Sequence, residues 1–427
     1  MIGHHRARGL AATLPLVVAL GLTACARDFP DTVFGAHSEL GRAVDGLNMR
    51  LLILGAIVFV LVETLLILAV FKFRSRPGHT EAAQTHGNTT LEVTWTLIPA
   101  VILAFIAVPT VKTIFQTQAT AVPNALQLEV IGHQWWWEFR YPQYNVVTAN
   151  ELYLPVGRTV NATLKSADVI HSFWIPNLAG GKRDAVSNHA NHLWFTPDSS
   201  YAYNGFCAEY CGASHANMQF KVFTVTPAEF DAYIKHQQTG PAFGAPPPGA
   251  PAGAPAAGAD TGKKAPPVTR VATSTGATTP AGAQAKPPVA TPVMGPGGTA
   301  TYPRDKLPKW VVPETPIPAG VTVSATSGDP SRGAQLFRTG ACIGCHTVQG
   351  VSPGIIGPNL THVGSRTTIA GGMYPNDMKH LTLWIKNAPV MKPGSLMPAM
   401  GKGLPHAMGA YDDQQIADIA AYLSSLK

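Results

Sequence analysis

Two long apolar runs near the start of the chain dominate its hydrophobic pattern. Residues 51–71, LLILGAIVFVLVETLLILAVF, are almost wholly apolar. At 1.5 Å per residue such a helix covers roughly 31 Å, enough to cross a bilayer core. The second run, WTLIPAVILAFIAVPTV (95–111), contains Pro99 and Pro109. Spanning helices tolerate proline where neighbouring helices satisfy the freed carbonyls, so the pattern predicts two transmembrane helices beside a partner subunit.

The charges around these runs predict their orientation. Lys72, Arg74 and Arg76 lie between the two runs. Because cytoplasmic loops are enriched in Lys and Arg, the 72–94 loop is predicted to be cytoplasmic and both ends of the hairpin to lie outside. The predicted bounds are 40–118 for the hairpin and about 51–72 and 95–115 for its spans.

From about residue 124 to 235 the pattern changes to short strands separated by turn signals. Segments such as ALQLEVIGHQWWWEFRY, ELYLPVGRTVNATLKS and QFKVFTVTP alternate or are rich in Val, Tyr, Phe and Thr. Several such strands predict an all-β Greek-key sandwich over 119–237. Three consecutive tryptophans cannot all face one side of a strand, so at least one is expected at the surface.

A Gly-, Ala- and Pro-rich stretch separates the sandwich from a third region. Residues 238–305 lack the apolar mass for a core and are predicted to be a disordered linker. The region beyond it, 328–427, ends in an amphipathic helix. Its apolar stripe falls at 416, 419, 420, 423 and 426.

Composition agrees with a membrane protein and narrows its partners. Charged residues are only 13% of the chain, against roughly 25% in ordinary soluble proteins. The net charge of +7 comes from 31 Lys and Arg against 24 Asp and Glu. Because the basic residues are scattered, no nucleic-acid-binding face is predicted.

The first residues are typical of an export signal. Positive charge in HHRARG precedes the apolar core LAATLPLVVALGL, which is too short to span a membrane. LTAC resembles a lipoprotein cleavage site, so 1–24 are predicted to be removed and Cys25 to become a lipidated N-terminus. An ordinary signal peptide or an uncleaved anchor, with Cys25 incidental, is the alternative.

The motif CAEYCGASHANM contains two cysteines that either form a disulfide or bind a metal. Cys207 and Cys211 alone fit a disulfide in an oxidising compartment. His215 and Met218 follow at positions +4 and +7, and VIHSFWIP supplies His171. Thiolate, imidazole and thioether are the ligands of copper electron-transfer sites, and a second thiolate allows both sulfurs to bridge two coppers.

A different motif, GACIGCHTV, lies in the C-terminal region. Cys342, Cys345 and His346 form the C-x-x-C-H pattern of covalent c-type haem attachment, in which the histidine is the proximal iron ligand. A redox C-x-x-C pair is the alternative. A methionine opposite the histidine suits electron transfer. The candidates are Met391, Met397, Met400 and Met408.

These motifs together resemble cytochrome c oxidase subunit 2 over most of the chain, with a fused cytochrome c as in the caa-type haem–copper oxidases. VIHSFW, CAEYCGASHANM, GHQWWWEFRY and LEVTWTLIPA carry the first resemblance. KPGSLMP resembles the methionine loop of class I cytochromes c and selects Met397. The implied fold is a multidomain membrane protein: a two-helix transmembrane hairpin, an all-β cupredoxin Greek-key sandwich, and an all-α class I cytochrome c domain at 328–427.

The resemblance also implies residue roles. A binuclear copper centre of two Cu would be held by His171, Cys207, Cys211, His215, Met218 and the Glu209 carbonyl. The Glu209 side chain would bind Mg shared with the catalytic subunit, near Asp184. Trp135 would be the surface tryptophan through which electrons enter, and Glu92 the carboxylate at a proton-channel mouth. Glu63, inside the first span, is expected to be a protonated side chain at a helix interface.

The implied function is electron input to a proton-pumping terminal oxidase. Cytochrome c or another upstream donor would reduce the haem, and the copper pair would feed catalytic subunit 1, where oxygen becomes water. Other oxidase subunits are further partners. The implied location is the bacterial inner membrane, as a multi-pass protein whose copper and haem domains lie on the periplasmic or outer side.

Two departures from the family pattern affect loops rather than ligands. Ser187-Asn188 stands where Pro-Gly is usual, and Phe206 where Gln commonly precedes the first Cys. Three rival functions fit the sequence less well. Nitrous oxide reductase would need a large propeller with a His-rich cluster, and a quinol oxidase subunit would have lost its copper ligands. A membrane-tethered electron shuttle would lack an oxidase partner.

Overall fold

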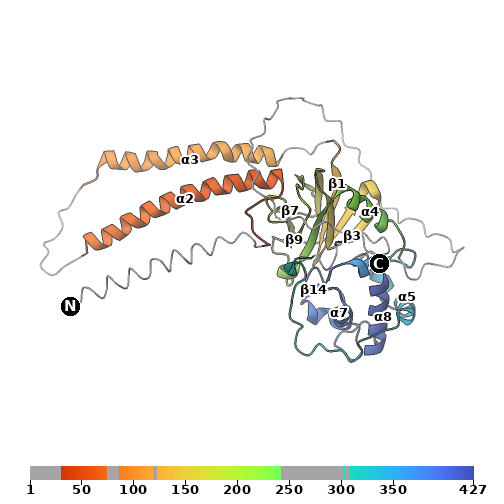
Figure 1. Ribbon diagram of the computed structural model, residues 1–427. Helices are drawn as coiled ribbons and strands as arrows, with labels where there is room; N and C mark the ends of the chain where they lie inside the picture. Colours follow the sequence, from red (N-terminus) through yellow and green to blue (C-terminus); the bar gives the residue numbers. More distant parts are fainter. Residues whose placement is uncertain (1–29, 75–85, 119–122, 242–301, 303–306) are drawn as a thin grey trace.

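The computed structural model describes residues 30–74, 86–118, 123–241, 302 and 307–427 (Figure 1). The predicted signal segment with Cys25 lies outside the described residues. The same holds for almost all of the predicted linker, 238–305.

Two long helices lie side by side and extend away from the rest of the molecule (Figure 1). α2 (Glu39–Lys72) and α3 (Thr89–Thr117) are long and apolar enough to cross a membrane, and their apolar windows are not buried against protein. α2 starts well before its predicted span because its first turn belongs to the sandwich. Ser38 caps it, and the Glu39 carboxylate accepts hydrogen bonds from the backbone N–H and hydroxyl of Thr196, at 3.0 and 2.7 Å.

The middle region is a sandwich of two five-stranded sheets, as predicted. The strands are β1 (Leu126–His133), β2 (Trp136–Tyr141), β3 (Val146–Ala149), β4 (Glu151–Pro155), β5 (Val160–Ser166), β6 (His171–Trp174), β7 (Arg183–Ala185), β8 (Asn191–Phe195), β9 (Tyr201–Cys207) and β10 (Gln219–Val225). The sheet orders are β3-β2-β1-β5-β8 and β4-β10-β9-β6-β7. Only β1–β5 and β10–β4 pair in parallel among the described strands of the two sheets, so the connections cross between sheets as in a Greek key.

The sandwich core explains why the chain folds this way locally. Successive positions along β1 alternate strictly between buried and half-buried, as expected for a strand with one face toward the core. Trp137, Phe139, Phe173 and Phe220 are fully buried and meet edge-to-face or stacked between the sheets. The helix α4 (Pro227–Gln237), begun by a capping box, closes the sandwich.

The C-terminal region is helical. Its helices are α5 (Pro330–Thr339), α6 (Cys342–Cys345), α7 (Met378–Met391) and α8 (Asp413–Ser425). This region also contains two short strand pairs, β11 (Thr347–Val348) with β12 (Ser352–Pro353) and β13 (Thr368–Ile369) with β14 (Tyr374–Pro375), and the 3-10 turn η5 (Val363–Ser365). The 3-10 turns η1 (Pro142–Tyr144) and η2 (His215–Asn217) belong to the sandwich segment, and η4 (Lys309–Val311) precedes α5. The predicted apolar stripe is confirmed: Ile416, Ile419, Ala420, Leu423 and Leu426 are all buried.

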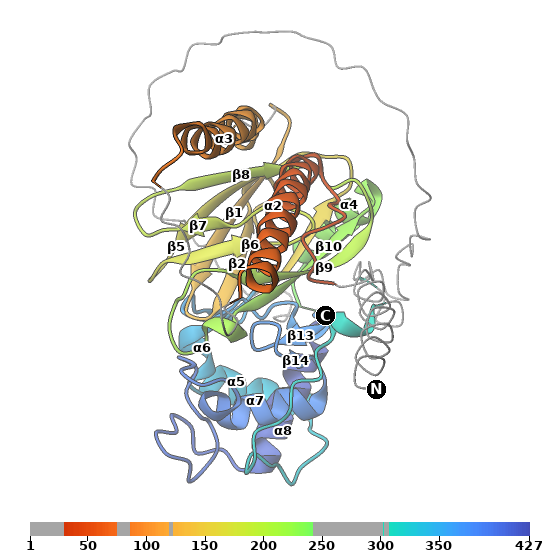
Figure 2. The same ribbon diagram turned by 90° about the vertical axis from the view of Figure 1, so that its left-hand side faces the viewer.

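This helical region packs directly on the sandwich. Figures 1 and 2 show it beneath the sheets, while α2 and α3 leave the sandwich in another direction. Hydrogen bonds join the two regions, including one from the Gln219 backbone N–H to the Gly371 carbonyl at 3.0 Å. The arrangement brings the loop after β9 close to the cytochrome-like region.

Candidate copper centre and haem cavity

The two cysteines of the loop after β9 lie close together without a bond between them. Cys207 ends β9, Cys211 follows in the loop, and both are buried and free. Their Sγ atoms are 3.7 Å apart, far beyond the roughly 2.05 Å of a disulfide. Both sulfurs therefore remain able to bind a metal.

His171 reaches the same sulfurs from the neighbouring strand β6. Its side chain is fully buried, and its Nδ1 lies 3.7 Å from the Sγ of Cys207. On the other side of the ring, Nε2 lies 2.7 Å from the Oδ1 of Asp168. A carboxylate behind a histidine fixes the ring and its tautomer, which is the usual support of a metal-binding imidazole.

The remaining predicted ligands complete the cluster. His215 Nδ1 and Met218 Sδ lie 3.6 and 3.8 Å from the Sγ of Cys211. The Glu209 carbonyl oxygen lies 3.3 Å from the Sγ of Cys207. One ligand atom each from His171, Cys207 and Cys211 lie within 4.8 Å of one another. Two thiols, two imidazoles, a thioether and a carbonyl form a soft donor set that fits copper.

The electrostatics of the two cysteines differ: the pKa of the Cys211 thiol is raised by its hydrogen bond with Cys207, whereas the pKa of the Cys207 thiol is lowered. The hydrogen bond from Cys211 lowers the pKa of the Cys207 thiol to about 3, and the contact with His171 acts in the same direction. Burial alone would lower the pKa of His171, but the hydrogen bond to Asp168 leaves it raised. The lowered pKa favours the thiolate at Cys207, and the thiolate is the form of cysteine that binds metals.

The Glu209 side chain points away from this cluster and pairs with lysine. Its carboxylate lies 2.6 Å from Lys182 Nζ, which is 3.5 Å from Asp184 Oδ1. The Asp184 carboxylate also accepts a hydrogen bond from Ser172 at 2.8 Å. The two acidic groups predicted near a magnesium ion therefore lie together, with an ammonium between them.

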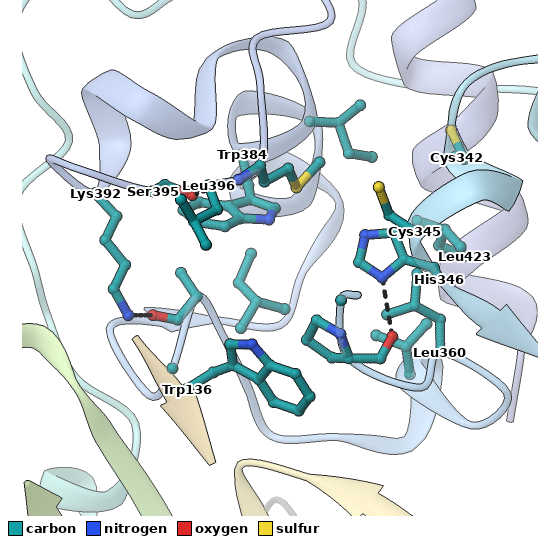
Figure 3. Close-up of a pocket in the computed structure, with 18 of the residues that line it drawn as sticks. Trp136, Cys342, Cys345, His346, Leu360, Trp384, Lys392, Ser395, Leu396 and Leu423 are labelled. Carbon is teal, nitrogen blue, oxygen red and sulfur yellow. Dashed lines mark hydrogen bonds between the residues drawn. The ribbon is translucent and has the colours of Figure 1, made fainter. Parts of the chain in front are cut away.

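A second candidate site is an apolar cavity in the C-terminal region (Figure 3). Cys342, Cys345 and His346 line one wall. His346 donates from Nδ1 to the Pro358 carbonyl at 2.9 Å, which leaves Nε2 as the free ligand atom. Burial lowers the pKa of His346, so the imidazole is neutral, as an iron ligand must be. A Cβ on Gly357 would stand 2.6 Å from the His346 ring, so only glycine allows this approach.

The cavity also separates the methionine candidates. Met397, Met400 and Met408 line it, whereas Met391 is buried in the core and is not among the lining residues. Two thiols and a neutral imidazole on one wall with thioethers in an otherwise apolar lining fit a covalently bound haem.

The three tryptophans of the β1–β2 turn divide between core and cavity. Trp137 is fully buried, while Trp135 and Trp136 are half-buried and line the haem cavity. The Trp135 Nε1 donates to the Cys211 carbonyl at 3.0 Å, so one side chain contacts both candidate sites. Trp136 stacks on His133 at 4.1 Å between ring centroids, and its indole faces the cavity in Figure 3.

The predicted proton-path residue lies apart from both sites. Glu92 is exposed in the first turn of α3, at the end of the hairpin far from the sandwich (Figure 1). Glu63 is exposed on α2.

Four residues at these sites were missed by sequence reasoning. Asp168 stands three residues before His171, a spacing that could have signalled its supporting role. Gln134 donates to the Cys211 carbonyl at 2.8 Å, Trp136 lines the haem cavity, and Lys392 lies between the two sites. The groups that Gln134, Trp136 and Lys392 meet at these sites are distant in sequence, so no local motif marks these three residues.

The fold and the sites define a membrane-anchored electron-transfer protein with a cupredoxin-type sandwich and a cytochrome c region. Known families agree. Residues 32–113 match the transmembrane domain of cytochrome c oxidase subunit II, residues 145–225 its periplasmic domain, and residues 330–427 cytochrome c. The chain belongs to the cytochrome c oxidase subunit 2 family and carries a cytochrome c domain.

Two relatives illustrate the extent of the similarity. Cytochrome c oxidase subunit 2 of Alkalihalophilus pseudofirmus is 30% identical over 390 residues, 89% of this chain and 86% of the relative. The protein of the same name from Bacillus sp. PS3 is 28% identical over 374 residues, covering 83% and 80%. Among solved structures, the periplasmic domain of subunit II of cytochrome oxidase from Bradyrhizobium japonicum is 29% identical, with a TM-score of 0.26, and covers 27% of this chain and 96% of that chain.

Proposed function

We propose that this chain is the electron-input subunit of a proton-pumping cytochrome c oxidase. An external donor delivers electrons to a haem held in the C-terminal cavity. They continue to a binuclear copper centre and then to a separate catalytic subunit, where oxygen is reduced to water. The observation that carries the proposal is Trp135, which lines the haem cavity and donates to the Cys211 carbonyl at 3.0 Å.

The copper ligands are assigned to the side-chain cluster around the copper loop, residues 207–218. Two coppers would be held by His171, Cys207, Cys211, His215, Met218 and the Glu209 carbonyl. Copper and haem, when bound, each supply a one-electron redox couple at their sites. Asp168 orients His171, and the buried cysteines exclude water from the centre, so little reorganisation accompanies a change of charge.

In the haem cavity, Cys342 and Cys345 would form the thioether links, and His346 and Met397 would be the protein ligands of the iron. The Pro358 carbonyl holds the His346 ring in the tautomer that presents Nε2. Apolar lining around a Met/His pair suits a high-potential electron carrier.

The membrane hairpin would join this chain to its partners. Glu92 is assigned to a proton-channel mouth formed with catalytic subunit 1. The Glu209 and Asp184 carboxylates are assigned to a shared magnesium site, which requires Lys182 to move aside on assembly. The sandwich and cytochrome region would lie on the periplasmic or outer side of the bacterial inner membrane, with residues 1–24 removed and Cys25 lipidated.

Spectroscopy of the full-length chain loaded with copper and haem tests this function. Electron paramagnetic resonance is expected to show one electron shared over two coppers, beside a low-spin haem with His/Met ligation. Cys207→Ser is expected to abolish the shared-electron signal, while the exposed-site variant Lys402→Met leaves it intact. A mononuclear copper signal in the parent chain contradicts the binuclear assignment. Purification in mild detergent without a haem-bearing partner contradicts the oxidase assignment and favours a tethered shuttle.

A further inference from the structure

Lys392 is a buried lysine whose ammonium is bound mainly by the other region of the molecule. It belongs to the loop that follows α7 and is only 3% exposed. Its Nζ donates to the Trp135 carbonyl at 2.7 Å, the Asn217 carbonyl at 3.0 Å and the Ala370 carbonyl at 3.0 Å. Two of these three acceptors belong to the sandwich: Trp135 lies between β1 and β2, and Asn217 lies within the loop of the copper motif, 207–218. Figure 3 shows the side chain extending past the haem cavity.

Glu151 has the reciprocal arrangement on the sandwich side. It begins β4 and is 5% exposed. Its carboxylate accepts hydrogen bonds from the backbone N–H groups of Thr367 and Thr368, at 2.5 and 3.2 Å, and from the Thr367 hydroxyl. The neighbouring Arg366 guanidinium, also in the cytochrome region, acts on Glu151 by favouring its charged form.

Further close contacts join the two regions at the residues that follow Lys392. Ser214 donates its hydroxyl to the Pro393 carbonyl, next to Lys392. Gly394 has a positive φ of 81°, and a Cβ there would stand 2.8 Å from the Trp135 ring. The methionine loop therefore lies directly on the tryptophan that contacts the copper loop.

The two buried charges restrict how the cytochrome region can be oriented on the sandwich. Burial lowers the pKa of Lys392 to about 7 and raises the pKa of Glu151, so each charge is costly where it lies. Such groups are tolerated only when hydrogen bonds satisfy them, and here most partners come from the other region. A rotated or shifted arrangement would leave an ammonium and a carboxylate buried without acceptors and donors. Buried charges of this kind select one geometry more than they add affinity.

We propose that Glu151 and Lys392 form a reciprocal interdomain latch that fixes the cytochrome region on the copper-bearing sandwich in one orientation. Both act as positioning residues: they hold the methionine loop against Trp135, and neither is one of the proposed copper or haem ligands. Because the two regions share one chain, docking is intramolecular and needs no long-range electrostatic steering. The consequence for electron transfer rests on the proposed function, whereas the latch itself rests on the contacts.

Hydrogen–deuterium exchange of the full-length chain, loaded with copper and haem, tests the latch. Lys392→Met and Glu151→Gln are each expected to raise exchange at least tenfold in segments 134–137 and 366–372. The copper and haem spectra of Glu151→Gln are expected to stay unchanged, because Glu151 lines neither site. After flash reduction of the haem, electron transfer from the haem iron to the copper centre is expected to slow at least tenfold. That rate should also become dependent on ionic strength.

Lys402→Met, which removes an exposed lysine of the same region, is the matched control and is expected to change none of these quantities. Should Lys392→Met fail to fold, Glu151→Gln tests the opposite half of the latch. Unchanged exchange and an unchanged transfer rate in the folded variants overturn the proposal. Loss of the copper or haem spectra in the parent chain instead rejects the proposed function, and the exchange measurement still decides on the latch.

Discussion

Asp168 shows how one side chain can support a metal site without touching the metal. Its carboxylate holds His171 Nε2 at 2.7 Å, so Nδ1 points to the cysteine sulfurs. His380 and Asp377 form a similar histidine–aspartate pair at the same sequence spacing, and neither residue belongs to the copper cluster or lines the haem cavity. The two pairs differ in what the other ring nitrogen faces.

Asp168→Asn is expected to weaken copper binding about 10- to 100-fold, as removal of a carboxylate behind a metal-bound histidine usually does. Competition with a copper chelator measures the affinity. Asp377→Asn is the matched control and should leave it unchanged. Equal affinities in Asp168→Asn and the parent chain would show that Asp168 does not support the centre.

Single side chains also decide which cavity methionine binds the haem iron. Met397 and Met400 both line the cavity, but Met400 is only 4% exposed and packs in the core. Met397→Leu is expected to remove the methionine–iron absorption band and to lower the haem potential by on the order of 100 mV. Met400→Leu should preserve both. Redox titration with optical detection distinguishes them, and the reverse pattern would reassign the axial ligand to Met400.

The helices α5 and α8 depend on a buried carboxylate for their packing. Asp418 in α8 is 2% exposed and accepts from the Asp329 backbone N–H at 2.7 Å and from Arg332 at 2.9 Å. The hydrogen bond from Arg332 lowers the pKa of Asp418, so the charged form stabilises the fold. That contribution is present above the ordinary aspartate pKa and is lost as pH falls below it.

Asp418→Asn is expected to destabilise the cytochrome region by about 1–3 kcal/mol, a range reduced because Arg332 is 58% exposed and partly screened by solvent. Denaturant unfolding followed by haem absorbance measures the change. Asp231→Asn, at an exposed position of α4, serves as the control. A loss below about 0.5 kcal/mol would mean that apolar packing alone joins the helices.

At the scale of the whole molecule, a histidine pair lies at the contact between the two regions, and we expect it to make that contact sensitive to pH. His362 of the cytochrome region donates to the Thr239 carbonyl at 3.1 Å, and its ring centroid lies 4.5 Å from that of His236 in α4. Burial, with a smaller effect of His236, lowers the pKa of His362 to about 4. Freed from the contact, the imidazole regains a pKa near 6.5 and binds protons more readily.

The docked arrangement is therefore expected to weaken as pH falls from about 6.5 to about 4, by about 2 kcal/mol at pH 5. Glu151 acts in the opposite sense, because burial raises its pKa. His362→Gln keeps a donor for Thr239 but cannot titrate, so it isolates the imidazole. Hydrogen exchange in 366–372 at pH 7 and pH 5 measures the effect. The same pH response in His362→Gln and the parent chain would exclude His362 as its source.

Features written in short, contiguous segments could be predicted from the chain alone. The two membrane helices follow from uninterrupted apolar runs, and α8 from its 3.6-residue stripe. The copper and haem motifs are equally local, because five of the six proposed copper-binding groups lie within residues 207–218 and the whole C-x-x-C-H pattern within residues 342–346. His171 is more distant, and it was predicted because the VIHSFWIP segment supplies a second imidazole for a copper donor set.

Contacts between segments far apart in the chain required the folded molecule. Glu151 and Thr367 are separated by 216 positions, and Lys392 and Trp135 by 257. Nothing in the spacing around Glu151 or Lys392 distinguishes them from surface charges. Only the packing of the helical region on the sandwich buries them and gives them partners. Sequence thus specifies the two redox motifs, whereas their meeting across Trp135 depends on long-range packing, which has no local signature.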